Sequence, residues 1–170
     1  QGFLFLIGHI MKNKLLILIV VLSSCTLKNN QILYDGQSNY WTEDLNEIEL
    51  VMSYILTHDE YKKLKSLESQ QKIEFLDKYW VEVDPDKSTI ENELLNELNT
   101  RVLESKELFS GFDGSLLSDR ARIYIVYGPP NSEIITPNYN NYSEVLTWKY
   151  KTGYEFNFII DSFGRYKLIN

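Results

Sequence analysis

Residues 118–130 read Ser118-Asp119-Arg120-Ala121-Arg122-Ile123-Tyr124-Ile125-Val126-Tyr127-Gly128-Pro129-Pro130, and this stretch decides the fold class of the sequence. Its centre, from Arg122 to Tyr127, is rich in β-branched and aromatic residues, which favours a β-strand. A glycine and two prolines follow, and prolines lack the backbone donors that a strand or a phosphate-binding loop needs. We therefore predict a strand over 122–127 that stops at a rigid exit.

The sequence beyond this stretch predicts a sheet whose strands are linked by turns. Residues 131–141 are rich in asparagine and contain Pro137, so we expect a loop there. Alternating apolar and polar residues follow. Further strands are expected at residues 145–150, 154–160 and 166–169, with turns at 151–153 and 161–164.

The sequence before the stretch predicts helices. Apolar residues recur at helical spacing over 45–55, which indicates a first helix. Thr57 and Glu60 form a capping-box pattern that opens a second helix, either continuous or broken near Ser69. This helix ends at Asp84-Pro85, because a residue before proline avoids the helical conformation.

A third helix is expected to begin at residues 88–89 and to run to about Phe109. Helices that precede a hairpin-linked sheet define an α+β domain. We therefore predict about three N-terminal helices followed by an antiparallel sheet of about four strands, all within one domain over residues 41–170.

The 118–130 stretch resembles the signature of the GWxTD domain family of bacterial envelope proteins. Ser118-Asp119 stands where the family has Thr-Asp. The residues that match as they stand are Arg120, Arg122, Tyr124, Tyr127, Gly128, Pro129 and Pro130. The resemblance extends over about residues 45–170, and it implies a fold and a cellular compartment rather than a chemical activity.

The sequence departs from the family at the positions that give the family its name. Ser115-Leu116 replaces Gly-Trp, and Ala121 replaces a glycine. A ligand platform built on that tryptophan would be missing here.

The densest polar cluster of the sequence is Asp119, Arg120 and Arg122, close to Tyr127. The arginines could orient a carboxylate or phosphate ligand, because a guanidinium binds such groups with two parallel hydrogen bonds. Alternatively, ion pairs within the cluster lock the loop before the predicted strand onto the helices. We favour the structural role but keep both for the signature cluster, which is Asp119, Arg120, Arg122, Tyr127, Gly128, Pro129 and Pro130.

The other polar residues predict no catalytic site, no metal site and no cofactor. Asp84, Asp86, Glu91 and Glu93 lie at a turn and a helix start, where acids stabilise the helix dipole. Their spacing does not match an EF-hand loop. Ser118 has no activating base near it in sequence. A hydrolase built on two of the carboxylates is the third alternative for the function.

Tyrosine is the most frequent aromatic residue of the chain, with 12 copies. Tyr139 and Tyr142 fall within or beside the expected loop. Exposed rings there could stack on sugars or fill the groove of a partner. A glycan- or peptidoglycan-binding module is therefore the second alternative for the function.

The N-terminal region predicts a lipid anchor. Two lysines precede an apolar run over 15–22, which is too short to span a bilayer. The tetrad Leu22-Ser23-Ser24-Cys25 resembles a lipobox, in which the cysteine receives a diacylglycerol, and Cys25 is the only cysteine. We expect residues 1–10 to lie upstream of the true start, 11–24 to form a signal peptide and 25–40 to form a flexible tether.

Composition limits the partners. The chain carries 17 Lys and Arg against 24 Asp and Glu, a net charge of −7, which makes nucleic acid a poor partner. The sequence therefore predicts a non-enzymatic protein of the bacterial cell envelope. It would be anchored, at the outer membrane, by lipid on Cys25, and would bind another envelope protein.

Overall fold

The computed structural model describes residues 38–138 and 143–169, and all of these belong to one unit of the chain, Gly36–Asn170. The helices found among them are α2 (Leu45–Ile55), α3 (His58–Lys65), α4 (Ser69–Val83), α5 (Glu93–Leu108), the short 3-10 helices η1 (Gly111–Asp113) and η2 (Ser115–Leu117), and α6 (Asp119–Tyr127). The strands that follow are β1 (Ser132–Asn138), β2 (Ser143–Lys149), β3 (Glu155–Ile160) and β4 (Tyr166–Leu168). Within the described ranges, no helix is both long and apolar enough to cross a membrane.

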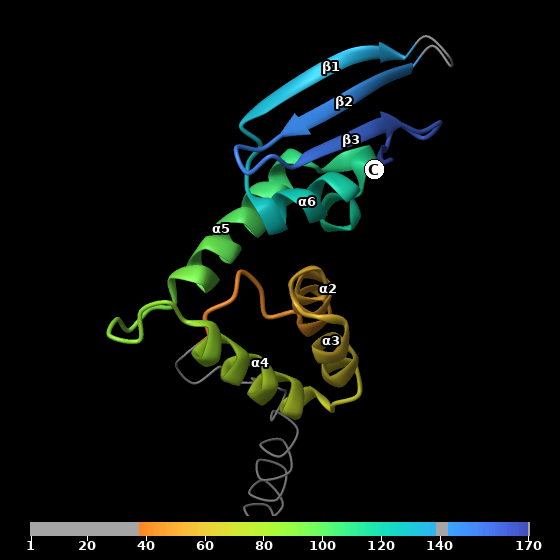
Figure 1. The fold of residues 1–170 in the computed structure, drawn as a ribbon. Helices are drawn as coiled ribbons and strands as arrows, with labels where there is room; N and C mark the ends of the chain where they lie inside the picture. Colours follow the sequence, from red (N-terminus) through yellow and green to blue (C-terminus); the bar gives the residue numbers. More distant parts are fainter. Residues whose placement is uncertain (1–37, 139–142, 170) are drawn as a thin grey trace, which may run out of the picture. The chain divides into compact units, whose positions relative to one another are not determined.

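The predicted α+β class is confirmed, and most of the helical region lies where it was expected (Figure 1). The capping box is present, since the backbone N–H of Thr57 donates to Glu60 Oε2 at 2.9 Å. The second predicted helix is broken into α3 and α4, and α4 ends before Pro85. The described residues therefore contain five α-helices, rather than about three.

The third predicted helix begins later than expected. Asn92 is its N-cap and accepts the N–H of Leu95 at 3.0 Å, so α5 starts at Glu93. The start at residues 88–89 is wrong, because the Ser88 hydroxyl donates to Asp86 Oδ1 at 2.6 Å and closes a turn. Asp86 Oδ1 also accepts the backbone N–H of Ser88 at 3.0 Å, so the carboxylate holds this segment in a turn.

The predicted strand over 122–127 is also wrong, because these residues form most of α6. This helix packs between the sheet and the helices α2 and α5 (Figure 1). A helix covered on two sides has no wide polar stripe, and a short apolar run does not distinguish a buried helix from a buried strand. The buried residues of α6 are Ala121, Ile123, Tyr124 and Ile125.

The sheet is antiparallel throughout, with strand order β1-β2-β3-β4. Strands β2, β3 and β4 lie close to the predicted positions. Strand β1 lies where the loop over 131–141 was expected, so that prediction is wrong for residues 132–138. Pro137 weakens the strand signal, but proline is tolerated in an edge strand, and β1 is one.

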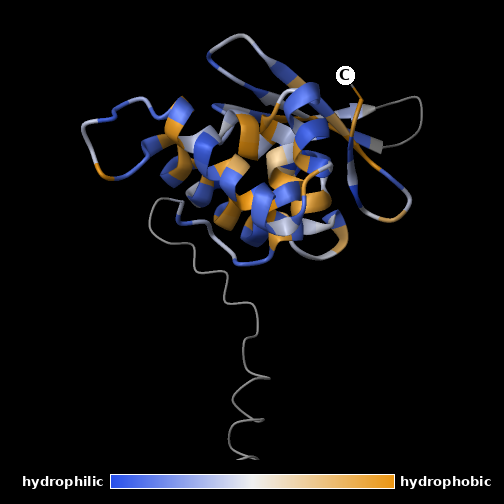
Figure 2. Cartoon of the chain, turned by 90° about the horizontal axis from the view of Figure 1, so that it is seen from below, coloured by the Kyte–Doolittle hydropathy of each residue, from blue (hydrophilic) through white to orange (hydrophobic). Residues whose placement is uncertain are grey.

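The core lies between α6 and the face of the sheet that carries Trp148 and Phe158, whose ring centroids are 5.1 Å apart. Leu146 on β2 and Tyr124 on α6 complete its centre. The helices carry both hydrophobic and hydrophilic segments, and hydrophobic residues also occur in loops at the outside of the domain (Figure 2). This arrangement places the start of α6 against β4 and its end near the turn between β2 and β3.

Candidate functional site

The signature stretch begins with a helix cap. Ser118 is buried, and its Oγ accepts the N–H of Ala121 at 2.9 Å, which caps the start of α6. The hydroxyl lone pairs face the backbone of the helix rather than a cavity. Ser118 therefore has a structural use at the position where a nucleophile was considered.

The outer edge of β4 is capped by two carboxylates. β4 pairs with β3 on one side, and its N–H groups at Tyr166 and Leu168 point the other way. Tyr166 donates to Asp113 Oδ1 at 2.9 Å, and Leu168 donates to Asp119 Oδ2 at 3.0 Å. We call Asp113 and Asp119 the carboxylate clasp. The clasp occupies the donors through which another strand could pair with this edge.

Each carboxylate of the clasp also binds an arginine. Arg120 Nε donates to Asp113 Oδ2 at 2.9 Å, and Arg122 Nη2 donates to Asp119 Oδ1 at 3.1 Å. The guanidinium of Arg120 lies 3.8 Å from the ring centroid of Tyr166, within cation–π range. The polar cluster of the sequence thus forms two ion pairs, and the carboxylate of each pair also binds the backbone of β4.

The end of α6 is fixed by a residue that sequence reasoning missed. Arg101 on α5 donates from Nη1 to the carbonyls of Ile125 at 3.2 Å and Val126 at 3.0 Å. Gly128 follows with φ 78° and ψ −168°, a conformation open essentially to glycine alone. A Cβ at Gly128 would lie 3.3 Å from the guanidinium carbon of Arg101. No local sequence pattern pointed to Arg101, because the carbonyls that it binds are 24 and 25 residues away in sequence.

An aromatic cluster surrounds this exit. The ring of Tyr127 lies 5.8 Å from Tyr150, 5.3 Å from Tyr154 and 4.9 Å from Phe156, measured between centroids. The Tyr150 hydroxyl donates to the Gly128 carbonyl at 2.9 Å, and burial raises the pKa of Tyr150 to about 12. Tyr154 is 55% exposed, so part of the cluster is a surface. Pro129 is exposed and Pro130 half-buried where the chain continues into β1.

Three predicted site residues lie outside the described residues: Cys25, Tyr139 and Tyr142. Their roles stay predictions.

The name-giving positions of the signature serve the backbone and the interior. Ser115 has φ 54° and is the one described residue other than glycine with a positive φ. Leu116 is buried, and its carbonyl accepts the hydroxyl of Tyr54 at 2.9 Å. A glycine suits the first position because it adopts a positive φ without strain. The second position fills the interior, so it offers no exposed platform.

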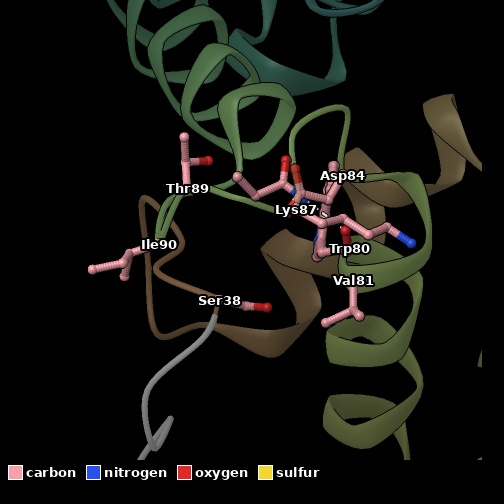
Figure 3. A pocket seen from close by; sticks show the side chains of 8 residues that line it. Ser38, Trp80, Val81, Asp84, Lys87, Thr89 and Ile90 are labelled. Atoms are coloured by element: carbon pink, nitrogen blue, oxygen red, sulfur yellow. Dashed lines mark hydrogen bonds between the residues drawn. The ribbon is translucent and has the colours of Figure 1, made fainter.

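Of the carboxylates considered in the sequence, Asp84 lines a small cavity of about 210 Å³ (Figure 3). Its lining residues are Ser38, Trp80, Val81, Asp84, Lys87, Thr89, Ile90 and Asn92. Ser38 Oγ and Trp80 Nε1 are buried there without a partner in the described part of the chain, and such atoms commonly bind water. Hydrogen bonds from Ser88 lower the pKa of Asp86, whereas a general acid needs a raised one. No cluster of three potential metal ligands occurs among the described residues.

No residue in the described part of the chain covers the edge formed by β1. Every side chain from Ser132 to Pro137 is exposed. Glu133 stands opposite the buried Trp148, and Ile135 stands opposite the buried Leu146, so both lie on the core-facing side of the sheet. Ile135 is nevertheless 59% exposed. The helices therefore cover the core face of the inner strands and stop before β1.

The backbone of β1 is open as well. Pro137 has no N–H, and proline is tolerated in a strand where its nitrogen faces away from the neighbouring strand. Alternation along the strand places the N–H groups of Glu133 and Ile135 on that same outer side. Within residues 38–138 and 143–169, neither group has an acceptor.

These features define a small α+β domain whose signature residues brace the fold and whose sheet has one capped and one open edge. The model of the GWxTD domain family matches residues 20–167. The chain therefore belongs to the GWxTD domain family, and the resemblance noted in the sequence is confirmed. No curated protein and no solved structure matches the chain.

Proposed function

We propose that this chain is a non-enzymatic protein of the bacterial cell envelope, anchored by lipid on Cys25 at the outer membrane, whose domain binds another envelope protein. The observation that supports binding most directly is the open β1 edge. It combines exposed isoleucines with backbone donors that have no acceptor among the described residues. Edges of this kind are sites of strand pairing between proteins.

The use of the signature polar groups supports a role without catalysis. Arg122 binds Asp119 and Arg120 binds Asp113, and both carboxylates also accept from the backbone of β4. The Ser118 hydroxyl accepts a backbone N–H. Nucleophilic catalysis needs an activated nucleophile beside an orienting base, and these contacts provide neither.

The lipid anchor is tested by replacing the acylated residue. In bacteria fed a labelled fatty acid, Cys25→Ser should lose all label, because the chain has no other cysteine. The matched control is Ser24→Ala, which keeps a small residue before the cleavage site and should keep the label. Label retained on the Cys25→Ser protein would end the lipoprotein proposal.

The absence of catalysis is tested with the purified chain. We expect no hydrolysis of peptidoglycan, other glycans or esters, with or without added divalent metal. Turnover that disappears on Asp84→Asn, Asp86→Asn or Asp119→Asn would instead support the hydrolase alternative.

A glycan-binding role is a second candidate, supported by the exposed face of the aromatic cluster. Tyr127 and Tyr154 present partly exposed rings 5.3 Å apart, and such rings can stack on sugars. Calorimetric titration with soluble peptidoglycan fragments tests this role. Binding that is lost in Tyr154→Ala would favour it over protein binding.

A further inference from the structure

We propose that β1 binds an extended segment of the partner protein as a fifth strand of the sheet, and that this segment carries lysine or arginine. The inference rests on the proposed function, to which it adds the mode of binding and the chemistry of the bound segment.

The first argument is the backbone of β1. The open edge offers the N–H groups of Glu133 and Ile135 in a row with the carbonyls between them. An extended strand satisfies such a row, whereas a docked helix brings no free backbone donors or acceptors along its length. The ligand should therefore be a strand.

The second argument is the pair of isoleucines. Ile134 and Ile135 are consecutive, so they lie on opposite faces of the strand, and they are 41% and 59% exposed. An added strand places its own side chains beside both faces. Apolar residues on both faces of an added strand would therefore bury both isoleucines. A partner that contacts one face of the sheet would bury only one of them.

The third argument is charge. Glu133 and Glu144 are both exposed, and neither forms an ion pair within the described residues. Glu144 stands opposite Pro137, and Pro137 lies on the same face as Glu133. The charged side chains that β1 and β2 present on this face are therefore both acidic, which attracts a segment with lysine or arginine.

The same charges argue against a second copy of this chain as the ligand. Two β1 strands that pair antiparallel about Ile135 would place Glu133 of each copy opposite Pro137 of the other. Glu144 of that other copy lies one strand further on the same face, about 10 Å away. Four carboxylates would then gather on one face, which disfavours the homodimer.

The experiment begins with site-specific photocrosslinking in the native membrane. A benzophenone amino acid is placed at position 135 of the full lipidated chain, and at Lys167 on β4 as the matched control, since Lys167 is exposed on the capped edge. We expect an adduct with a different protein from position 135 alone. The crosslinked segment, mapped by mass spectrometry, should be an extended stretch with a basic residue.

A synthetic peptide of the mapped segment then tests the binding mode. It should slow hydrogen exchange of the Glu133 and Ile135 amides. The double variant Glu133→Lys and Glu144→Lys should weaken peptide binding about ten-fold or more, because two attractions become repulsions. The control Glu107→Lys changes an exposed acid on α5 and should alter the affinity by less than about two-fold.

The outcomes separate this inference from the proposed function. A stable complex that crosslinks elsewhere, or a peptide that binds without protecting the two amides, overturns strand addition and leaves the interaction role standing. An adduct between two copies of the chain, or a mapped segment without basic residues, overturns the stated partner chemistry. The failure of every position to capture a partner overturns both proposals.

Discussion

The two edge strands of the sheet, β4 and β1, differ in whether their outward backbone N–H groups are hydrogen-bonded within the described residues. At β4, the carboxylates of Asp113 and Asp119 accept the outward N–H groups of the strand. At β1, the equivalent groups have no acceptor in the described part of the chain, and both faces of the strand are exposed. An open edge is a liability that proteins usually block. Two carboxylates cap one edge, and no described residue caps the other, which supports the proposal that the open edge binds a partner.

The largest effect on this comparison should come from Asp113→Asn. The Asp113 side chain is almost fully buried, and loss of its charge leaves the mostly buried guanidinium of Arg120 without its counter-charge. Breaking such a pair costs about 3–5 kcal/mol. We expect a loss of this size in the free energy of unfolding from urea titration. A change below about 1 kcal/mol would show that the clasp does not hold β4.

Asp119→Asn should have a smaller effect, because this side chain is a quarter exposed and its ion pair lies at the surface of α6. Asparagine keeps only one of the two acceptor oxygens, so the hydrogen bond to Leu168 or the bond to Arg122 is lost, at a cost of about 1–3 kcal/mol. We expect the melting temperature to fall by several degrees in the absence of any ligand. An unchanged melting temperature together with lost partner binding would point to a ligand-binding role for Asp119.

Alkaline pH should loosen the exit from which β1 departs. The pKa of Tyr150 is raised to about 12 from 10.0, chiefly by burial, so its contribution to stability is complete below pH 10 and is lost as the pH rises towards 12. Tyr150→Phe should reduce the loss of stability over that range, measured by denaturant titration at each pH. Tyr124, whose pKa is also raised to about 12, keeps part of the dependence in the variant. Identical pH dependence in both proteins would contradict the assignment.

The smallest effect should come from Glu133→Lys on the open edge. Its side chain is exposed and forms no ion pair within the described residues, so the free energy of unfolding should change by less than about 0.5 kcal/mol. Circular dichroism with urea titration measures this. A loss comparable to that of Asp119→Asn would mean that β1 is braced by its side chains after all.

Sequence reasoning succeeded where the structural cause is local. The capping box at Thr57, the helix stop at Pro85 and the strands β2, β3 and β4 all follow from patterns a few residues long. The resemblance to the GWxTD family rested on a contiguous stretch and is confirmed by the family match.

Sequence reasoning failed where the cause is tertiary. α6 lost its helical signature because it is covered by the sheet on one side and by helices on the other. β1 lacked a strand signature because no layer of the described residues covers its side chains, so its sequence does not need to alternate between apolar and polar residues. Of the clasp, Asp119 was found through the family signature, but Asp113 was not, because its partner at Tyr166 is 53 residues away.

Ser115 adopts a left-handed backbone conformation at the position where the family has glycine. A left-handed conformation at a residue with a side chain costs about 1–2 kcal/mol relative to glycine. The turn survives because Ser115 donates its N–H to the Phe109 carbonyl at 2.8 Å and accepts the N–H of Ser118 at 3.0 Å. At these two positions the chain therefore keeps a left-handed backbone and a filled interior with residues other than glycine and tryptophan.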